Sequence, residues 1–195
     1  MSRHIYLASR SPRRAELLQQ MGIDFDMLPS DIDESILPNE LPETYVMRLA
    51  GSKAAVGLAN MRQANLQQRP ILAADTTVSV DGVILGKPEN DEDARVMLKR
   101  LSGRWHEVHT ALALVSTVGI EAVLSTTRVE LAPLSDEMIA AYIASGEPRD
   151  KAGAYAIQGL AGTFTRRIEG SYSGVMGLPI YETAQLLRNA GIKLL

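Results

Sequence analysis

The chain has 195 residues and no cysteine, which excludes disulfides, thiolate nucleophiles and cysteine-bound zinc. Its 20 basic and 23 acidic residues give a net charge of -3, which argues against a nucleic-acid-binding protein, because such proteins normally carry a basic excess. No apolar run approaches the ~20 residues of a membrane span, and the N-terminal apolar patch is too short for a signal peptide. We therefore expect a cytoplasmic protein that forms one domain over residues 1–195, with no membrane or nucleic-acid partner.

The N-terminal stretch joins a strand to a helix. Residues 5–8 are apolar and predict a strand, and Pro12 stands at the first position of a helix that we expect to end near Gly22. Two hydroxyls and two guanidiniums gather at this helix start: Ser9, Ser11, Arg13 and Arg14. Free N–H groups at a helix start favour an anion, so the pattern indicates a phosphate site. An ordinary Ser-Pro cap with solvated arginines explains the spacing equally well.

Further strands and helices follow. Residues 23–28 predict a second strand, and residues 42 or 43 to about 60 predict a helix. The acidic run between them ends in Glu34 and offers oxygen ligands for a hard cation. Lys53 lies on the apolar stripe of the expected helix. It is either a lysine that reaches solvent at the edge of the stripe or a lysine aimed into a cleft.

Asp75 follows an apolar run that predicts the next strand. Residues 70–74 show no polar alternation, which is typical of a strand buried on both faces. An aspartate at the end of such a strand lies where open α/β sheets bind their ligands. The pair Asp81-Gly82 then predicts a short hairpin, and Gly86-Lys87-Pro88 closes this unit.

The second half of the chain predicts helices, strands, a glycine-rich segment and a loop. Helices are expected over residues 91–101, 135–146 and 179–190 and strands over residues 105–117, 120–131 and 163–168. The glycine-rich segment covers residues 150–162, and the loop covers residues 170–174. His106 and His109 lie three apart in a strand and should point to opposite faces, so we expect them to share no metal. The fold class that follows is α/β with a mixed sheet.

Acids and cations from several segments are the strongest chemical signal. The chain has no Walker A motif, no GxGxxG opening a helix and no GxSxG elbow. The candidate residues are Ser9, Ser11, Arg13, Arg14, Glu34, Lys53, Asp75 and Lys87. Hydrolysis of a phosphoanhydride needs cations that hold the charge, magnesium that neutralises it and a carboxylate that orients or deprotonates water. Together these residues favour a nucleotide or phosphate ester as substrate.

Six blocks, taken in order, carry a family resemblance. They are Leu7-Ala-Ser-x-Ser-Pro-Arg-Arg14, Ala74-Asp75-Thr76, Gly86-Lys87-Pro88, Leu101-Ser102-Gly103 with His106-Glu-Val, Asp150-Lys-Ala-Gly-Ala-Tyr-x-Ile-Gln158-Gly, and Gly170-Ser-Tyr with Gly177-Leu-Pro. Over about residues 5–190 the chain resembles the Maf (septum formation inhibitor) proteins, which are nucleoside triphosphate pyrophosphatases. The resemblance implies an elongated α/β structure in which a mixed twisted sheet with flanking helices forms two lobes around a deep nucleotide-binding cleft. It also implies a possible homodimer.

The resemblance also implies roles for individual residues. The implied reaction depends on Mg²⁺ or Mn²⁺ and cleaves a nucleoside triphosphate between the α and β phosphates. Asp75 matches the proposed proton acceptor, and Glu34 matches an acid at the metal end, so these two are the expected metal ligands. The positions that hold the triphosphate match Ser9, Arg13, Arg14, Lys53 and Lys87.

Three positions imply the substrate: Arg13, Thr76 and Gln158. The branch that resembles this chain acts on dTTP, UTP and related pyrimidines, whereas a branch that prefers 7-methyl-GTP has a tryptophan in place of Arg13. An arginine there would repel the cationic methylated guanine. Gln158 offers one acceptor and one donor for the N3–H and a carbonyl of uracil or thymine. We therefore expect hydrolysis of dTTP and UTP; the alternative is a nucleotide-binding regulator of cell division without significant turnover.

Overall fold

The computed structural model describes residues 4–194, and within them seven strands form one mixed sheet in the order β2-β1-β3-β5-β6-β7, with β4 paired to β3. The strands are β1 (His4–Leu7), β2 (Asp24–Met27), β3 (Ile71–Val80), β4 (Val83–Leu85), β5 (Trp105–Ser116), β6 (Gly119–Leu131) and β7 (Thr165–Glu169). Strand β1 runs parallel to β2 and β3, and the other strand pairs within residues 4–194 are antiparallel. The expected α/β class with a mixed sheet is confirmed.

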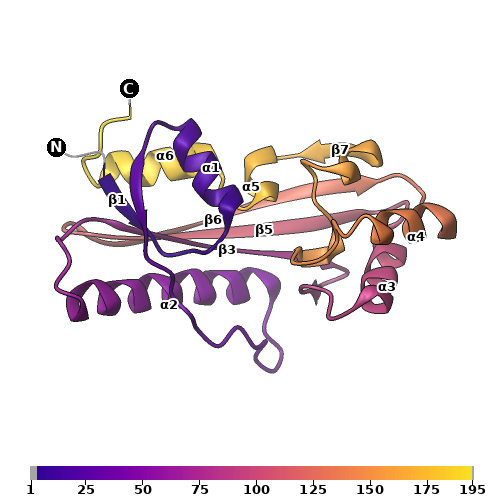
Figure 1. The fold of residues 1–195 in the computed structure, drawn as a ribbon, viewed down its shortest axis with the longest axis horizontal. Coiled ribbons are helices and arrows are strands. Elements are labelled where there is room, and N and C mark those ends of the chain that lie inside the picture. Colours follow the sequence, from indigo (N-terminus) through magenta and orange to yellow (C-terminus); the bar gives the residue numbers. More distant parts are fainter. Residues whose placement is uncertain (1–3, 195) are drawn as a thin grey trace.

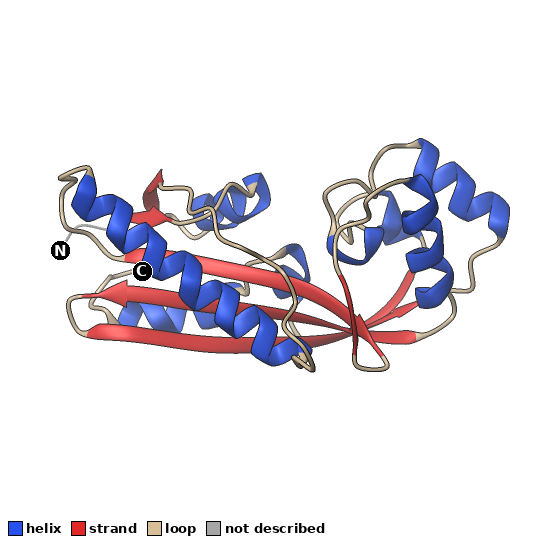
Figure 2. Cartoon of the chain, turned by 90° about the horizontal axis from the view of Figure 1, so that it is seen from below, coloured by secondary structure: helices blue, strands red, loops and turns tan. Residues whose placement is uncertain are grey.

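Helices cover the sheet in two groups (Figures 1 and 2). The helices are α1 (Pro12–Gln20), α2 (Pro42–Gln63), α3 (Asp91–Leu101), α4 (Asp136–Ala144), α5 (Tyr172–Met176) and α6 (Ile180–Asn189), with the 3₁₀ turns η1 (Ala152–Ala154) and η2 (Leu160–Thr163). Helices α1, α2 and α6 gather around one end of the long strands, and α3 and α4 gather at the other end. We call these two ends the α2 lobe and the α3 lobe. Strands β3, β5 and β6 run through both.

The α2 lobe has three layers. Small residues of α2, such as Ala50 and Ala54, pack on Ile71 and Ala73 of β3. On the opposite face, leucines of α1 and α6 pack on Leu72. Because both faces are covered, this part of β3 has no polar alternation, as its sequence predicts.

The α3 lobe packs around a separate apolar cluster. Leu98 of α3 and Ile139 of α4 contact this cluster together with Val78 and Val129 of the sheet. Both helices have side-chain caps, since Asn90 accepts a hydrogen bond from the Asp93 N–H and Ser135 accepts one from the Met138 N–H. The two lobes expected from the family resemblance are therefore built on separate cores that share one sheet.

Several predicted boundaries were wrong. Asp75 is the fifth of the ten residues of β3, whereas the sequence placed it at the end of a strand. The strand continues because β5 pairs with it from Ile71 to Ser79, and the β-branched residues that follow Asp75 suit a strand. The expected loop at 170–174 contains the start of α5, whereas α2 ends at Gln63, within a few residues of its approximate expected end near residue 60. Within residues 4–194, none of the helices is both long and apolar enough to cross a membrane.

Candidate active site

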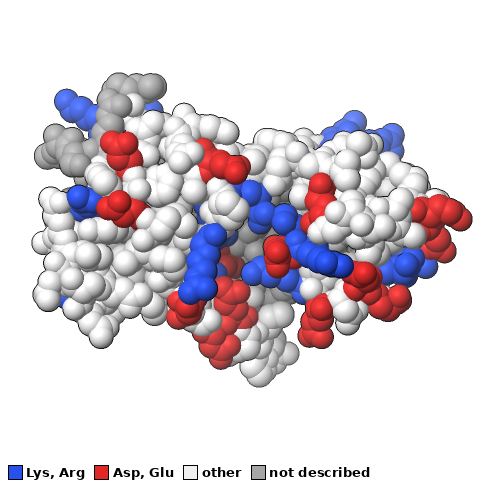
Figure 3. Space-filling view, in the orientation of Figure 1, with Lys and Arg blue, Asp and Glu red and all other residues white. Residues whose placement is uncertain are grey.

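The cleft lies beside an interruption in the sheet. Strand β1 pairs with β3 at Ile71 and Leu72, and β4 pairs with β3 from Val78 onward. Between these contacts, residues 73–77 of β3 have no neighbouring strand on that side within residues 4–194. A cleft of about 740 Å³ opens here and is lined by both lobes. This volume is in the range of small-ligand sites. Figure 3 shows basic and acidic side chains gathered at the hollow between the lobes.

All ten residues proposed from the sequence line this cleft: Ser9, Ser11, Arg13, Arg14, Glu34, Lys53, Asp75, Thr76, Lys87 and Gln158. They come from six separate stretches of the sequence: residues 9–14, 34, 53, 75–76, 87 and 158. We name two parts of the lining by their residues. The charged wall consists of Ser9, Arg14, Glu34, Lys53 and Asp75, and the loop wall consists of residues 150–158.

Lys53 joins two carboxylates in the charged wall. Its Nζ lies 2.6 Å from Asp75 Oδ1 and 2.6 Å from Glu34 Oε1. The side chains of Lys53 and Asp75 are only 11% and 9% exposed, so Lys53 is aimed into the cleft rather than into solvent. The first explanation of its place on the apolar stripe, a lysine that reaches solvent, was therefore wrong.

Helix α2 also holds the loop that carries Glu34. The Tyr45 hydroxyl donates to the Glu34 carbonyl at 2.9 Å, and Arg48 donates to the Ser35 carbonyl at 3.0 Å. Tyr45 lines the cleft, and burial together with the charges of Asp75 and Glu34 raises its pKa to about 12, so it stays a neutral donor. Tyr45 could not be identified from the sequence, because its position on the apolar stripe of the helix gives no sign of this contact.

The environments of the two carboxyls push their pKa values apart. Burial raises the pKa of Asp75, and the opposing charges of Lys53 and Arg14 do not fully offset this. Burial acts on Glu34 in the same direction, but the hydrogen bond and charge of Lys53, with Lys87 and Arg14, hold its pKa below the ordinary value. Such a pair is suited to separate tasks, with Asp75 taking up a proton more readily than an ordinary aspartate and Glu34 remaining ionised.

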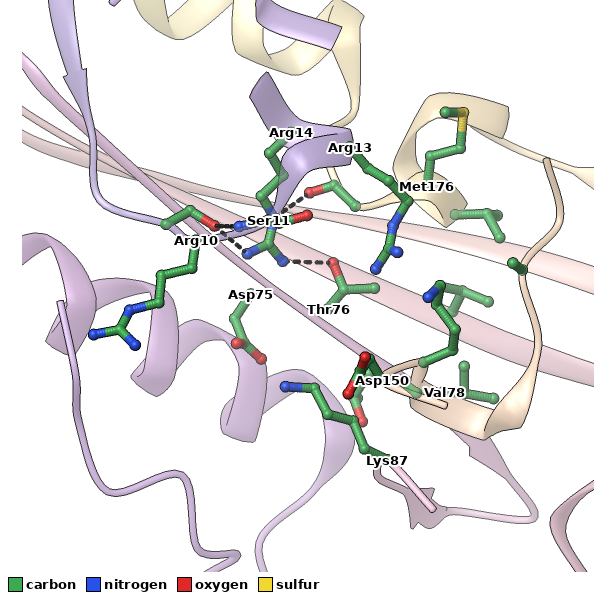
Figure 4. A pocket seen from close by; sticks show the side chains of 18 of the residues that line it. Arg10, Ser11, Arg13, Arg14, Asp75, Thr76, Val78, Lys87, Asp150 and Met176 are labelled. Atoms are coloured by element: carbon green, nitrogen blue, oxygen red, sulfur yellow. Dashed lines mark hydrogen bonds between the residues drawn. The ribbon is translucent and has the colours of Figure 1, made fainter. Parts of the chain in front are cut away.

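Arg14 is bound to the protein on three sides (Figure 4). Its guanidinium donates to the Gly177 carbonyl at 2.8 Å, to Ser9 Oγ at 3.1 Å and to Thr76 Oγ1 at 3.2 Å. Thr110 donates to the Gly174 carbonyl at 2.8 Å, so in the 2.9 Å pair between the two threonine hydroxyls Thr76 is the donor. Arg14 therefore fixes Ser9, Thr76 and the end of α5 to one another while its charge acts on Asp75.

The remaining cations are less constrained. Arg13 and Lys87 point into the cleft from opposite sides, and neither makes an ion pair or hydrogen bond with another residue in the range 4–194. Ser11 is the N-cap residue of α1, but its side chain makes no capping hydrogen bond. Ser11 and Pro12 do occupy the cap and first helical positions of an ordinary Ser-Pro cap, but Arg14 is held by protein contacts and is not a solvated arginine. The Ser11 hydroxyl is available to a ligand. Arg10, at the mouth of the cleft, pairs with exposed Asp31 at 2.7 Å.

The loop wall packs closely against β3. Gly153 has a φ of 67°, and a Cβ there would lie 2.9 Å from a methyl of Val78, so both the backbone and the space require glycine. Tyr155 is buried and its hydroxyl lies 2.8 Å from His106 Nε2. The Gln158 side chain is exposed at the cleft. His106 thus supports the loop, and His109 contacts Ser79 and Thr126 elsewhere in the sheet, so the two histidines share no site.

The charged wall has a donor set that suits a hard divalent cation. Two carboxylates, Asp75 and Glu34, converge on one cationic group in the structure. Magnesium in nucleotide-dependent enzymes is commonly bound by one or two carboxylates together with substrate phosphates. Within residues 4–194 no cluster of three or more His, Asp or Glu side chains could hold a metal, so a cation on Asp75 and Glu34 would take its other ligands from water or from substrate phosphates.

The chain is similar to known proteins over almost its whole length. It is 64% identical over 188 residues to a dTTP/UTP pyrophosphatase of Methylobacillus flagellatus, covering 96% of this chain and 93% of the relative. It is 53% identical to a dTTP/UTP pyrophosphatase of Chromobacterium violaceum, covering 97% and 96%. Among solved structures, the Staphylococcus aureus Ham1 protein matches with a TM-score of 0.48 and 15% identity over 96% of this chain and 99% of that one. The family model described as Maf-like protein matches residues 4–190, and the chain therefore belongs to the Maf family.

Proposed function

We propose that this protein hydrolyses dTTP and UTP to the nucleoside monophosphate and pyrophosphate, with Mg²⁺ or Mn²⁺ as cofactor; modified pyrimidine nucleotides fall within this proposal. The relatives described above carry this activity in their names. The observation that carries the proposal within this chain is the Asp75–Lys53–Glu34 arrangement, in which one buried lysine joins two carboxyls with divergent pKa values. A cleft lined by further cations supplies the complementary charge for a triphosphate.

Asp75 is the general base in this proposal. Its carboxylate accepts a proton from a water molecule as the water oxygen forms a bond to the α-phosphorus, and the bond from that phosphorus to the oxygen bridging to the β-phosphorus breaks. A raised pKa makes this carboxylate a better base at neutral pH than an exposed aspartate. Lys53 orients Asp75 through its 2.6 Å contact.

The cations of the cleft stabilise the charge on the phosphates. Arg13 and Lys87 have no hydrogen-bond or ion-pair partner in the described part of the chain, so they can contact the leaving pyrophosphate without breaking a protein contact. The Ser9 and Ser11 hydroxyls line the same cleft and directly precede α1, which carries Arg13. Asp75 and Glu34 would hold the divalent cation, which neutralises triphosphate charge when bound. Arg14 is fixed by its hydrogen bonds to the protein, and its positive charge stabilises negative charge in the site.

Gln158 selects the base in this proposal. Its amide oxygen accepts from the N3–H of uracil or thymine, and its amide nitrogen donates to a ring carbonyl. Arg13 disfavours a cationic base, and Thr76 borders the same cleft with its hydroxyl already held by Arg14 and Thr110. These roles stay predictions, as do a homodimer, a cytoplasmic location, a single domain over residues 1–195 and the absence of a nucleic-acid partner.

A panel of nucleoside triphosphates tests the proposed function. With purified protein and Mg²⁺, pyrophosphate release should be fastest from dTTP and UTP, and removal of the metal with a chelator should stop it. A preference for 7-methyl-GTP would overturn the substrate assignment. Binding of dTTP without turnover over hours would support the regulator instead; a pure sensor, however, has no need of a carboxylate placed as Asp75 is.

A further inference from the structure

Glu147 lies behind the loop wall, outside the cleft. We propose that it is a positioning residue for Gln158: its carboxylate fixes the backbone on both sides of Gln158, so that the amide side chain faces the base of a bound pyrimidine nucleotide. This inference rests on the proposed function, since it concerns how the same site selects its base.

The first support is the set of hydrogen bonds that the Glu147 carboxylate accepts. The Leu160 N–H donates to Oε2 at 2.9 Å and the Ala161 N–H donates to Oε1 at 3.2 Å. The Tyr142 hydroxyl also donates to Oε1, at 2.8 Å. The carboxylate therefore holds the first turn of η2, which begins two residues after Gln158.

The same carboxylate reaches the other side of Gln158 through Tyr142. The Tyr142 hydroxyl accepts from the Ala156 N–H at 3.1 Å while it donates to Glu147. Tyr142 is only 5% exposed, and its ring packs edge-on against Phe164 at 5.1 Å between centroids. Gln158 thus lies on a short loop whose two ends, at Ala156 and Leu160, are tied to one charged group.

Gly159 shows how closely the carboxylate approaches this loop. A Cβ at Gly159 would lie 2.2 Å from Glu147 Oε2. The φ of Gly159 is negative, -109°, so no left-handed backbone calls for glycine here, whereas the space beside the Glu147 carboxylate does. Glu147 cannot simply turn away, because it would lose three hydrogen bonds.

Glu147 stays ionised in this arrangement. Burial raises its pKa, but the hydrogen bonds from Leu160, Tyr142 and Ala161 outweigh that effect and leave the pKa below the ordinary value. By contrast, the Gln158 side chain makes no hydrogen bond with any residue in the range 4–194 and is exposed. Its direction is therefore set by the backbone that Glu147 holds, and a loosened loop should weaken the pairing with the base.

The test compares Glu147→Gln and Tyr142→Phe with Gln158→Ala and with the double variant Glu147→Gln/Gln158→Ala. The matched control is Glu137→Gln, which makes the same charge change on an exposed residue of α4, away from the cleft. We expect Glu147→Gln to raise the KM for dTTP and UTP roughly 3- to 10-fold, no more than Gln158→Ala does, with kcat changed less than about 2-fold. Tyr142→Phe should act in the same direction, and Glu137→Gln should change neither constant.

The double variant decides between positioning and a general structural effect. If Glu147 acts through Gln158, the double variant should be no worse than Gln158→Ala alone, and amide hydrogen exchange at residues 156–161 should be faster in Glu147→Gln than in wild type. The inference would be overturned if the KM increases of the two single variants multiplied in the double variant, or if Glu147→Gln lowered kcat/KM equally for every nucleotide. Either result would leave the proposed function intact. A wild-type protein that fails to hydrolyse dTTP would refute the proposed function itself. Thermal melting of each variant identifies any that fail to fold, and Tyr142→Phe then replaces Glu147→Gln.

Discussion

In the charged wall, ionic side chains touch each other directly, whereas in the loop wall the cleft-facing side chain of Gln158 is exposed and is held only through its backbone neighbours. Lys53 contacts both Asp75 and Glu34, and Arg14 contacts Ser9 and Thr76. The phosphate chemistry is the same for every nucleotide and needs a fixed arrangement of charge. Base selection differs between nucleotides and can be carried by a loop on a rigid support.

This difference predicts how substitutions divide between kcat and KM. A change in the charged wall should lower kcat for all nucleotides, because it alters groups at the reacting phosphate. A change in the loop wall should alter KM and the ratio between nucleotides, because it alters contacts to the base alone. A loop-wall variant that lowered kcat equally for every nucleotide would break the comparison.

Asp75→Asn should give the largest effect. The amide keeps the shape of the side chain but cannot accept a proton from water, so kcat for dTTP should fall by roughly 10²-fold or more with a smaller change in KM. Pyrophosphate release under saturating dTTP measures this. Asp31→Asn is the control, since Asp31 borders the same cleft but is exposed and paired with Arg10. An active Asp75→Asn enzyme would move the role of base to Glu34 or another carboxylate.

Lys53→Met should shift the acid limb of the pH profile. The base must be ionised, so activity falls as pH drops through the pKa of Asp75. Burial raises that pKa, and Lys53 is the strongest influence that lowers it. Without Lys53 the pKa of Asp75 rises further, and the acid limb of kcat/KM should move to higher pH, with a loss of about 10-fold or more below the new pKa. If the acid limb of kcat/KM does not move in Lys53→Met, that limb reflects the ionisation of a group other than Asp75.

Gln158→Ala should have a smaller effect that is confined to base selection. Losing the paired contacts should reduce the preference for dTTP over GTP by about 10-fold, mainly through the KM for dTTP, while kcat stays within about 2-fold. Side-by-side kinetics with the two nucleotides measure the ratio. Leu160→Ala, which changes another exposed side chain of the same loop region outside the cleft lining, is the control and should leave the ratio unchanged.

Most elements of the fold could be predicted from the sequence, because apolar periodicity and the Gly or Pro residues at the ends of helices and strands are local signals. It misplaced Asp75 because the length of β3 depends on pairing with β5, which lies some thirty residues further along the chain. The site residues were identified by family resemblance, and all of them line the cleft. Spacing alone could not show that Lys53 joins two carboxylates or that Arg14 is committed to protein contacts, since these distances depend on how α1, α2 and β3 pack. Glu147 was missed because its partners are backbone N–H groups, which have no sequence signature.

The smallest expected effect is a change in thermal stability, which should occur for a substitution in the charged wall and not for one in the loop wall. The pKa of Asp75 is raised on folding, so its contribution to stability is fully present below the pKa of the unfolded chain and is lost as pH rises through the folded pKa. Asparagine resembles the protonated form, so Asp75→Asn should raise Tm at pH 7, on the order of 2–4 °C, with the difference shrinking toward pH 4. Gln158→Ala should leave Tm unchanged at both pH values, because that side chain is exposed. Scanning calorimetry of the two variants at pH 7 and pH 4 measures this, and a lower Tm for Asp75→Asn at pH 7 would mean that the contact with Lys53 outweighs the cost of burying the carboxylate.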